Sequence, residues 1–241
     1  MNLRSIKAQL IIFLALFTLY LAINTKDVLF LSGLGISLVV AVAADSFVVR
    51  LKTKKIIITE SSIISGLIIG CVLSYSGKWW VAVIAALLAI ASKHIIKFRN
   101  RHFFNPAAFG VVASVFLLGA ATEWKGASLW YFILPFGVYV FFKIKKPELI
   151  ISYFISSFIL FGGQAIINKV NVLDTFGYLN YFFIFIMLIE PMTTPMTKVG
   201  KIIFGFGTGA LIFVLYGLGV KEPELSALLC FNLLTPLLNS A

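Results

Sequence analysis

The sequence predicts an all-α integral membrane protein of about ten transmembrane helices. Of its 241 residues, 61% are hydrophobic and 12% are charged, whereas a soluble domain is about a quarter charged. The apolar residues form continuous runs without the two-residue alternation of a membrane barrel, so helices must satisfy the backbone in lipid. This composition excludes soluble enzymes, nucleic-acid-binding proteins and secreted disulfide scaffolds, and it makes the lipid bilayer the first expected partner.

Each apolar run is expected to form one helix. A span takes about 20 residues, and several runs are short enough to be tilted or broken helices. Eight spans with re-entrant pieces is therefore the alternative count. The runs cover residues 8–23, 28–49, 58–76, 79–95, 104–121, 127–143, 149–167, 176–192, 200–219 and 223–239.

The basic residues between the runs predict the orientation. With a cytoplasmic N-terminus, one side of the membrane carries most of the 20 Lys and Arg residues. The other side carries one lysine per loop. The expected location is the cytoplasmic membrane. The positive-inside rule then places both termini on its cytoplasmic side. The cytoplasmic set is Arg4, Lys7, Arg50, Lys52, Lys54, Lys55, Lys93, Lys97, Arg99, Arg101, Lys143, Lys145, Lys146, Lys198 and Lys201, and the outer set is Lys26, Lys78, Lys125, Lys169 and Lys221.

A weak internal repeat divides the chain into two halves. His102–Phe109 opens the fifth run and Val220–Ala227 opens the tenth. Five spans per half is an odd number, so the halves 1–126 and 127–241 of one transmembrane domain would be inverted relative to each other. Inverted repeats place binding sites near the midplane, where broken helices line them.

Ionisable residues inside the runs are the first candidates for function. Asp45, Lys93 and His94 lie near the cytoplasmic ends of their apolar runs. Two interpretations stay open for them: a structural role, as interface anchors or ion pairs, and a chemical role. Glu60 and Glu190 are the candidates for ion or proton exchange, because each adjoins hydroxyl residues and a helix break or close-packing site.

Prolines mark three expected structural helix breaks. Pro191 and Pro195 prevent a regular helix in Glu190–Thr197 and free backbone groups there, so this segment should line a cavity or bind something. A simple kink is the alternative. Pro106 follows Asn105, a residue that can cap the fifth helix, and capping alone would explain that pair. No catalytic or metal-binding spacing is present.

These motifs resemble the NqrB/RnfD family, the membrane subunits of sodium-pumping NADH:quinone reductases and Rnf electron-transport complexes. The similarity covers most of residues 55–240. It implies two inverted five-helix halves, similar to the urea and ammonium channels. It also implies a flavin in the membrane that passes electrons between NAD(P)H or ferredoxin and quinone or other acceptors. The matching pieces are Ser65–Gly70, Trp79–Trp80, Lys93–His94, Phe104–Gly110, Glu190–Thr197, Gly200–Gly205, Ala227–Leu229, Asn232 and Pro236.

Two departures limit what the resemblance implies. The family's covalent FMN is carried by a Ser/Thr-Gly-Ala-Thr motif, and the nearest stretch here is Gly119–Thr122, with Leu118 in place of the hydroxyl. Any flavin (FMN or riboflavin) would therefore be non-covalent. Glu190 also stands where the family usually has Asp, which keeps the charge but lengthens the side chain. The expected flavin contacts are Ser65, Asn105, Thr193 and Thr194.

The expected function is that of a membrane subunit in an Rnf- or Nqr-like electron-transport system, with cation movement as a coupled process. The chain has no NAD site and no iron–sulfur cysteines, so it would depend on other membrane or cytoplasmic redox subunits. Such a chain would be part of an ion-translocating oxidoreductase. The alternatives are a channel or transporter for a small polar solute or flavin on the same fold, and a purely structural subunit.

Overall fold

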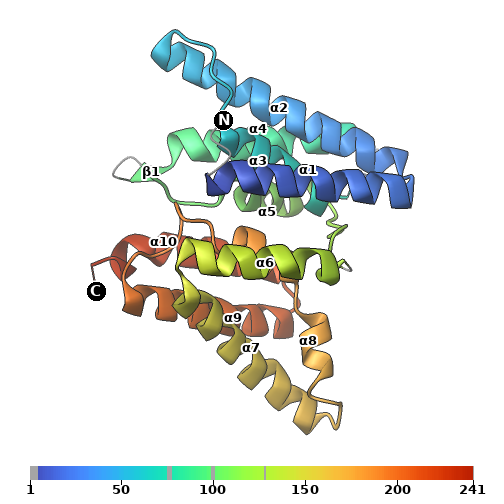
Figure 1. The fold of residues 1–241 in the computed structure, drawn as a ribbon, viewed down its shortest axis with the longest axis vertical. Coiled ribbons are helices and arrows are strands. Elements are labelled where there is room, and N and C mark those ends of the chain that lie inside the picture. Colours follow the sequence, from blue (N-terminus) through green and yellow to red (C-terminus); the bar gives the residue numbers. More distant parts are fainter. Residues whose placement is uncertain (1–4, 75–77, 99–100, 128, 241) are drawn as a thin grey trace. The chain divides into compact units, whose positions relative to one another are not determined.

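The computed structural model describes residues 5–74, 78–98, 101–127 and 129–240 (Figure 1). Arg4 and Arg99 of the predicted basic set, and the end of the third apolar run, lie outside these residues. Within them the regular secondary structure is helical apart from one short hairpin of β1 (Lys97–Phe98) and β2 (Arg101–His102) and an isolated bridge between Leu73 and Thr122. The chain divides into two compact units, unit 1 (residues 1–132) and unit 2 (residues 133–241), and each is described by itself.

Unit 1 holds five helices, most of which start at a polar cap. Ser5, Asp27, Thr59 and Asn105 each accept a hydrogen bond from the backbone N–H three residues on, which satisfies a donor that the first helical turn leaves free. The helices are α1 (Ile6–Thr25), α2 (Val28–Thr53), α3 (Glu60–Val72), α4 (Trp79–Ile95) and α5 (Pro106–Leu118).

Unit 2 is less regular in its middle. It contains most of α6, which begins at Trp130 at the end of unit 1. The later elements include a π-helix, in which each turn is wider than in an α-helix. They are α6 (Trp130–Ile144), α7 (Pro147–Ile167), α8 (Asp174–Tyr178), the π-helix η1 (Phe183–Met187), α9 (Lys198–Gly217) and α10 (Pro223–Leu238).

The helices confirm a helical membrane protein. Four of them, α1, α2, α7 and α9, are long and apolar enough to cross a membrane by length and composition, and α3, α4, α5, α6 and α10 are shorter apolar helices. One expected span differs: the run 176–192 is not a single helix. Its first helix ends at Tyr178, and the Asn180 side chain then caps a new turn by accepting from Phe183 N at 3.0 Å.

The same packing order occurs in both units. In unit 1, α2 packs on α4 and α4 on α5; in unit 2, α7 packs on α9 and α9 on α10. Glycines allow close approach in both. A Cβ at Gly110 would lie 2.3 Å from Ala85 O, and one at Gly205 would lie 2.1 Å from Leu149 O. The inversion of one unit against the other stays a prediction.

The two repeat motifs stand at equivalent places in these units. His102–Phe109 leads into α5, whose first residue is Pro106, and Val220–Ala227 leads into α10, whose first residue is Pro223. Proline suits this position because the first helical turn needs no donor from it. Both α5 and α10 therefore begin with a proline, but a side chain caps only α5 of these two.

Candidate functional site

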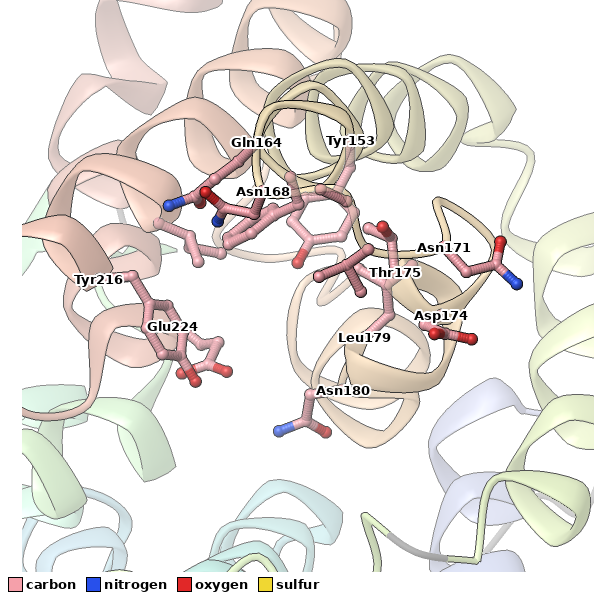
Figure 2. A pocket seen from close by; sticks show the side chains of 14 residues that line it. Tyr153, Gln164, Asn168, Asn171, Asp174, Thr175, Leu179, Asn180, Tyr216 and Glu224 are labelled. Atoms are coloured by element: carbon pink, nitrogen blue, oxygen red, sulfur yellow. The ribbon is translucent and has the colours of Figure 1, made fainter.

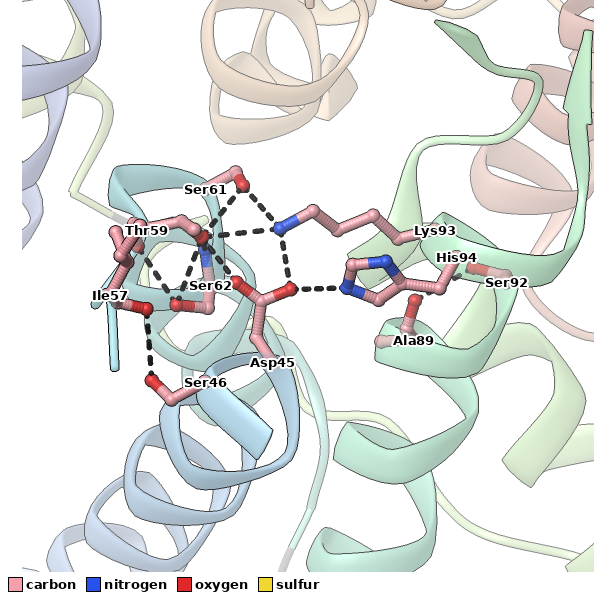
Figure 3. A network of polar contacts seen from close by, with 10 residues as sticks. All are labelled: Asp45, Ser46, Ile57, Thr59, Ser61, Ser62, Ala89, Ser92, Lys93 and His94. Atoms are coloured by element: carbon pink, nitrogen blue, oxygen red, sulfur yellow. Dashed lines mark hydrogen bonds and ion pairs between the residues drawn. The ribbon is translucent and has the colours of Figure 1, made fainter. Parts of the chain in front are cut away.

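Unit 1 contains a buried polar cluster, here called the Asp45 cluster, formed by Asp45, Thr59, Ser61, Lys93 and His94 (Figure 3). The carboxylate of Asp45, on α2, has no exposed surface. Lys93 Nζ donates to its Oδ1 at 2.8 Å, and His94 Nε2 lies 2.7 Å from the same oxygen. These three residues are thus paired with one another, and the structural pairing considered for them from sequence is present.

Hydroxyl groups from the start of α3 complete the Asp45 cluster. Thr59, the N-cap of α3, donates from Oγ1 to the other carboxylate oxygen of Asp45. Lys93 Nζ donates to Thr59 Oγ1 at 3.2 Å and to Ser61 Oγ at 2.6 Å. One carboxylate therefore connects three helices, and each charged group meets a partner of opposite charge or a hydroxyl.

His94 also faces an apolar groove between α2 and α4. Its second ring nitrogen, Nδ1, is buried and has no hydrogen-bond partner among the residues that the structure describes. The groove has a volume of about 770 Å³, and Lys52 lies at its border. Its walls are Val39, Val40, Ala43, Ala44, Phe47, Val48, Leu87, Ile90, Ala91 and Ile95.

The sequence-predicted site residues of unit 1 lie at three separate positions along its helices. Ser65 is buried within α3. Asn105 is buried as the N-cap of α5, where its Oδ1 accepts from Ala108 N at 3.1 Å. Glu60 is the half-buried first residue of α3. It stands between two members of the Asp45 cluster in sequence but forms no ion pair among the described residues.

In unit 2 the segment 190–197 consists of turns between η1 and α9. Pro191 is exposed and Pro195 is buried. Thr197 ends the segment as the N-cap of α9, accepting from Gly200 N at 3.1 Å. Glu190 is half-buried at its start.

The two central threonines of this segment, Thr193 and Thr194, are both buried. The carbonyl of Thr193 accepts from Asn232 Nδ2 at 3.2 Å and from Thr235 Oγ1 at 2.8 Å. The Thr193 hydroxyl is buried with no hydrogen-bond partner in the described part of the chain. Thr194 Oγ1 donates to Glu190 O at 2.8 Å and accepts from Lys146 Nζ.

The structure thus groups Glu190, Thr193 and Thr194 in one segment, and it places Glu60, Ser65 and Asn105 in the other unit. The groove beside His94 and a second cavity in unit 2 are lined by other residues. The sequence did not indicate the roles of Lys146 and Thr235, which lie 48 and 42 positions from their partners. For Lys146, the available signal was its position directly before Pro147, at the start of a helix.

Continuous apolar helices with polar groups buried between them define a helical multi-pass membrane protein. Its first 130 residues match the model of the NQR2, RnfD, RnfE family. Because this match covers more than half of the chain, the protein belongs to that family, as the resemblance predicted. The segment 190–197, which carried part of that resemblance, lies outside the matched residues. A search of curated proteins finds no match.

Proposed function

We propose that this protein is a membrane subunit of an Rnf- or Nqr-like electron-transport system and binds a flavin non-covalently. The family match over residues 1–130 carries the proposal, because it supports a membrane subunit of such a complex. The helices long enough to cross a membrane are consistent with this role. The flavin would supply the redox chemistry, and the chain would supply binding, orientation and local charge.

Thr193 gives the strongest support for a polar ring ligand in unit 2. Its hydroxyl is buried without a partner, and a buried polar group without a hydrogen bond costs about 1–3 kcal/mol. A carbonyl or ring nitrogen of a ligand could satisfy this hydroxyl without breaking an existing bond. Thr194, in the same segment, would have to share a hydroxyl that already donates to Glu190 O.

The attachment is proposed to be non-covalent because of residues 118–122. Leu118 replaces the hydroxyl residue of the covalent-FMN motif and the stretch has one extra alanine. Thr122, the only hydroxyl residue of Gly119–Thr122, is half-buried and pairs with Leu73 in an isolated β-bridge. This geometry therefore does not favour the attachment of a flavin phosphate to Thr122.

Cation or proton exchange is proposed for Glu60 and Glu190. Both are half-buried and both stand where regular structure begins or ends. Carboxylates in such places can exchange protons or cations with water while remaining close to the protein interior. The charge distribution of the loops supports a cytoplasmic-membrane location with both termini inside, where other redox subunits would meet the basic loops.

The test is an absorption and fluorescence spectrum of the protein purified gently in detergent, followed by acid extraction. The expected result is a flavin spectrum whose chromophore is released by acid. The variant Thr193→Val should bind several-fold less flavin, because it removes the free hydroxyl and keeps the side-chain shape. Thr208→Val is the matched control, since among the described residues the Thr208 hydroxyl bonds only to Phe204 O of its own helix, at 2.7 Å.

Two results would contradict the proposal. A colourless protein, even when it is purified with its membrane partners and supplied with FMN and riboflavin, would exclude the flavin and direct attention to solute flux in proteoliposomes. A flavin that stays on the protein after acid treatment would show a covalent link and overturn the non-covalent attachment.

A further inference from the structure

Unit 2 contains a cavity, separate from the segment 190–197, with a volume of about 360 Å³ (Figure 2). It lies where α7 and α9 end and α10 begins, with α8 beside it. Tyr153 and Ile212, each 3% exposed, form its buried part. Tyr216 and Asn168 are exposed at its border. Pockets for small molecules measure roughly 300–1,000 Å³, so this cavity has room for a small organic molecule.

The charge inside the cavity comes from Glu224. This residue lies in the first turn of α10, directly after Pro223, where the helix dipole favours the ionised carboxylate. No Lys, Arg or His lines the cavity, and Glu224 forms no ion pair among the described residues. A carboxylate partly removed from water is costly without a positive partner. A cationic ligand in the cavity would therefore stabilise the ionised form of Glu224.

Aromatic side chains line the same cavity as this carboxylate. Tyr216 lies beside Glu224 in Figure 2. The rings of Phe161 and Tyr216 meet edge to face, with centroids 6.1 Å apart. Aromatic faces attract organic cations, and quaternary ammonium groups are recognised by such groups of rings. A carboxylate and three aromatic side chains in one cavity thus combine two attractions for the same kind of ligand.

Side-chain amides supply the remaining polar lining. Gln164, Asn168 and Asn180 each offer a carbonyl oxygen as acceptor and an amide group as donor. A metal ion is disfavoured, because the described residues contain no group of three His, Cys, Asp or Glu side chains that could hold one. Asp174, which also borders the cavity, is exposed.

We propose that this cavity binds an organic ammonium ion, with Glu224 as its counter-ion and Tyr153, Phe161 and Tyr216 as its aromatic walls. The lining shares no residue with the proposed flavin contacts. The cavity can therefore bind its ligand whether or not the protein carries flavin, and failure of one proposal leaves the other intact.

The test compares two probes that differ in charge but not in shape: choline and its neutral carbon analogue 3,3-dimethylbutan-1-ol. Binding to the purified full-length protein is measured by calorimetry at constant ionic strength. We expect choline to bind at least tenfold more tightly than the neutral analogue. Glu224→Gln should weaken choline binding at least tenfold, whereas Glu222→Gln, the same change two residues away outside the lining, should alter it less than threefold.

Three outcomes would overturn the proposal. Equal binding of choline and the neutral analogue to the unmodified protein would show an apolar cavity without charge recognition. This comparison needs no variant, so it holds even if Glu224→Gln fails to fold. Unchanged choline binding in a folded Glu224→Gln protein would exclude Glu224 as counter-ion. Sodium chloride competing with choline at equal concentration would show a site for inorganic cations.

Discussion

One buried stretch of each unit is built differently from the other, although the helices of the two units pack in the same order. In unit 1 it is α3, a regular helix of 13 residues. In unit 2 it is η1 followed by the turns of 190–197. Both stretches are buried along most of their length. The difference lies in how their polar groups are satisfied.

In unit 1 the two ends of α3 are held by two different kinds of interaction. Its N-terminal end joins the Asp45 cluster through Thr59. Its C-terminal end pairs with the chain that follows α5, through the bonds Glu123 N to Val72 O at 2.8 Å and Lys125 N to Cys71 O at 3.0 Å. At its C-terminal end the backbone of α3 is thus satisfied by backbone, whereas at its N-terminal end polar side chains pair with one another.

In unit 2 side chains satisfy the backbone instead. Pro191 and Pro195 have no N–H to donate, and they prevent a regular helix that would use the preceding carbonyls. A buried carbonyl must still find a donor, and Thr193 O finds two, from Asn232 and Thr235 of α10. The comparison teaches that beside this proline pair the polar side chains of α10 hold the main chain, whereas at the C-terminal end of α3 the backbone does so.

The largest effect is expected from Asp45→Asn. The change keeps the shape but leaves the Lys93 ammonium buried without its counter-charge, and breaking a buried ion pair costs about 3–5 kcal/mol. The midpoint of thermal unfolding in detergent, followed by tryptophan fluorescence, should therefore fall by many degrees. Adding Lys93→Met to this variant should restore part of the loss, because it removes the unpaired charge.

A loss below about 1 kcal/mol in Asp45→Asn would break the comparison, because it would mean that α3 does not depend on the buried charge pair. No recovery in the double variant would show that the hydroxyl contacts of Thr59 and Ser61, rather than the charges, hold the three helices together.

A smaller effect is expected from Thr235→Val in unit 2. This variant removes one of the two side-chain donors to Thr193 O, and a single hydrogen bond contributes about 0.5–1.5 kcal/mol. Amide hydrogen exchange should accelerate across residues 190–197. Thr208→Val is the matched control, because the Thr208 hydroxyl bonds to a carbonyl within α9 and should leave exchange in that segment unchanged.

If exchange across 190–197 does not change in Thr235→Val, Asn232 alone is sufficient to hold Thr193 O. The side-chain bonds would then be redundant in unit 2, and the contrast with the backbone pairing of unit 1 would be weaker than the geometry indicates.

The sequence predicted the helical membrane class because apolar runs such as 28–49 and 149–167 carry their signal locally. The helices observed there are α2 and α7, with bounds a few residues away. The start of α5 was predicted from an equally local signal, because Asn105 and Pro106 are adjacent in the sequence. The break at Asn180 was not predicted from the run 176–192, because one polar residue in an apolar run is a weak signal. The bond that makes it a cap depends on local backbone geometry.

The candidate site was predicted less completely, for a physical reason. Asp45 and Lys93 are 48 positions apart, and only the packing of α2 on α4 brings them together. Glu224 was visible only as part of a repeat motif, since the cavity around it needs residues from α7, α8 and α9. Proline-rich local motifs such as Glu190–Thr197 were found because their unusual composition is contiguous.

The smallest effect is expected from the half-buried ion pair of Asp27 with Lys125 in unit 1, which is still reached by water and sharpens the contrast with fully buried Asp45. Lys125 Nζ lies 2.9 Å from Asp27 Oδ2, and this hydrogen bond is the main cause that lowers the pKa of Asp27 below its ordinary value. A lowered carboxyl pKa stabilises the folded protein at neutral pH. That contribution is lost as the pH falls below the usual carboxyl range and through the pKa of the folded state.

Asp27→Asn makes the same chemical change as Asp45→Asn and preserves the α2 cap, because asparagine caps helices as well as aspartate. It should lower the unfolding midpoint at pH 7 only slightly, since ion pairs that water reaches contribute about 0–1 kcal/mol. It should also reduce the loss of stability that occurs as the pH falls below about 4. Lys125→Met should cost somewhat more, because it also removes the ion pair of Lys125 with Glu123 Oε1 at 2.7 Å, and the two changes together should cost less than their sum. Equal losses for Asp27→Asn and Asp45→Asn would show that burial does not distinguish these carboxylates.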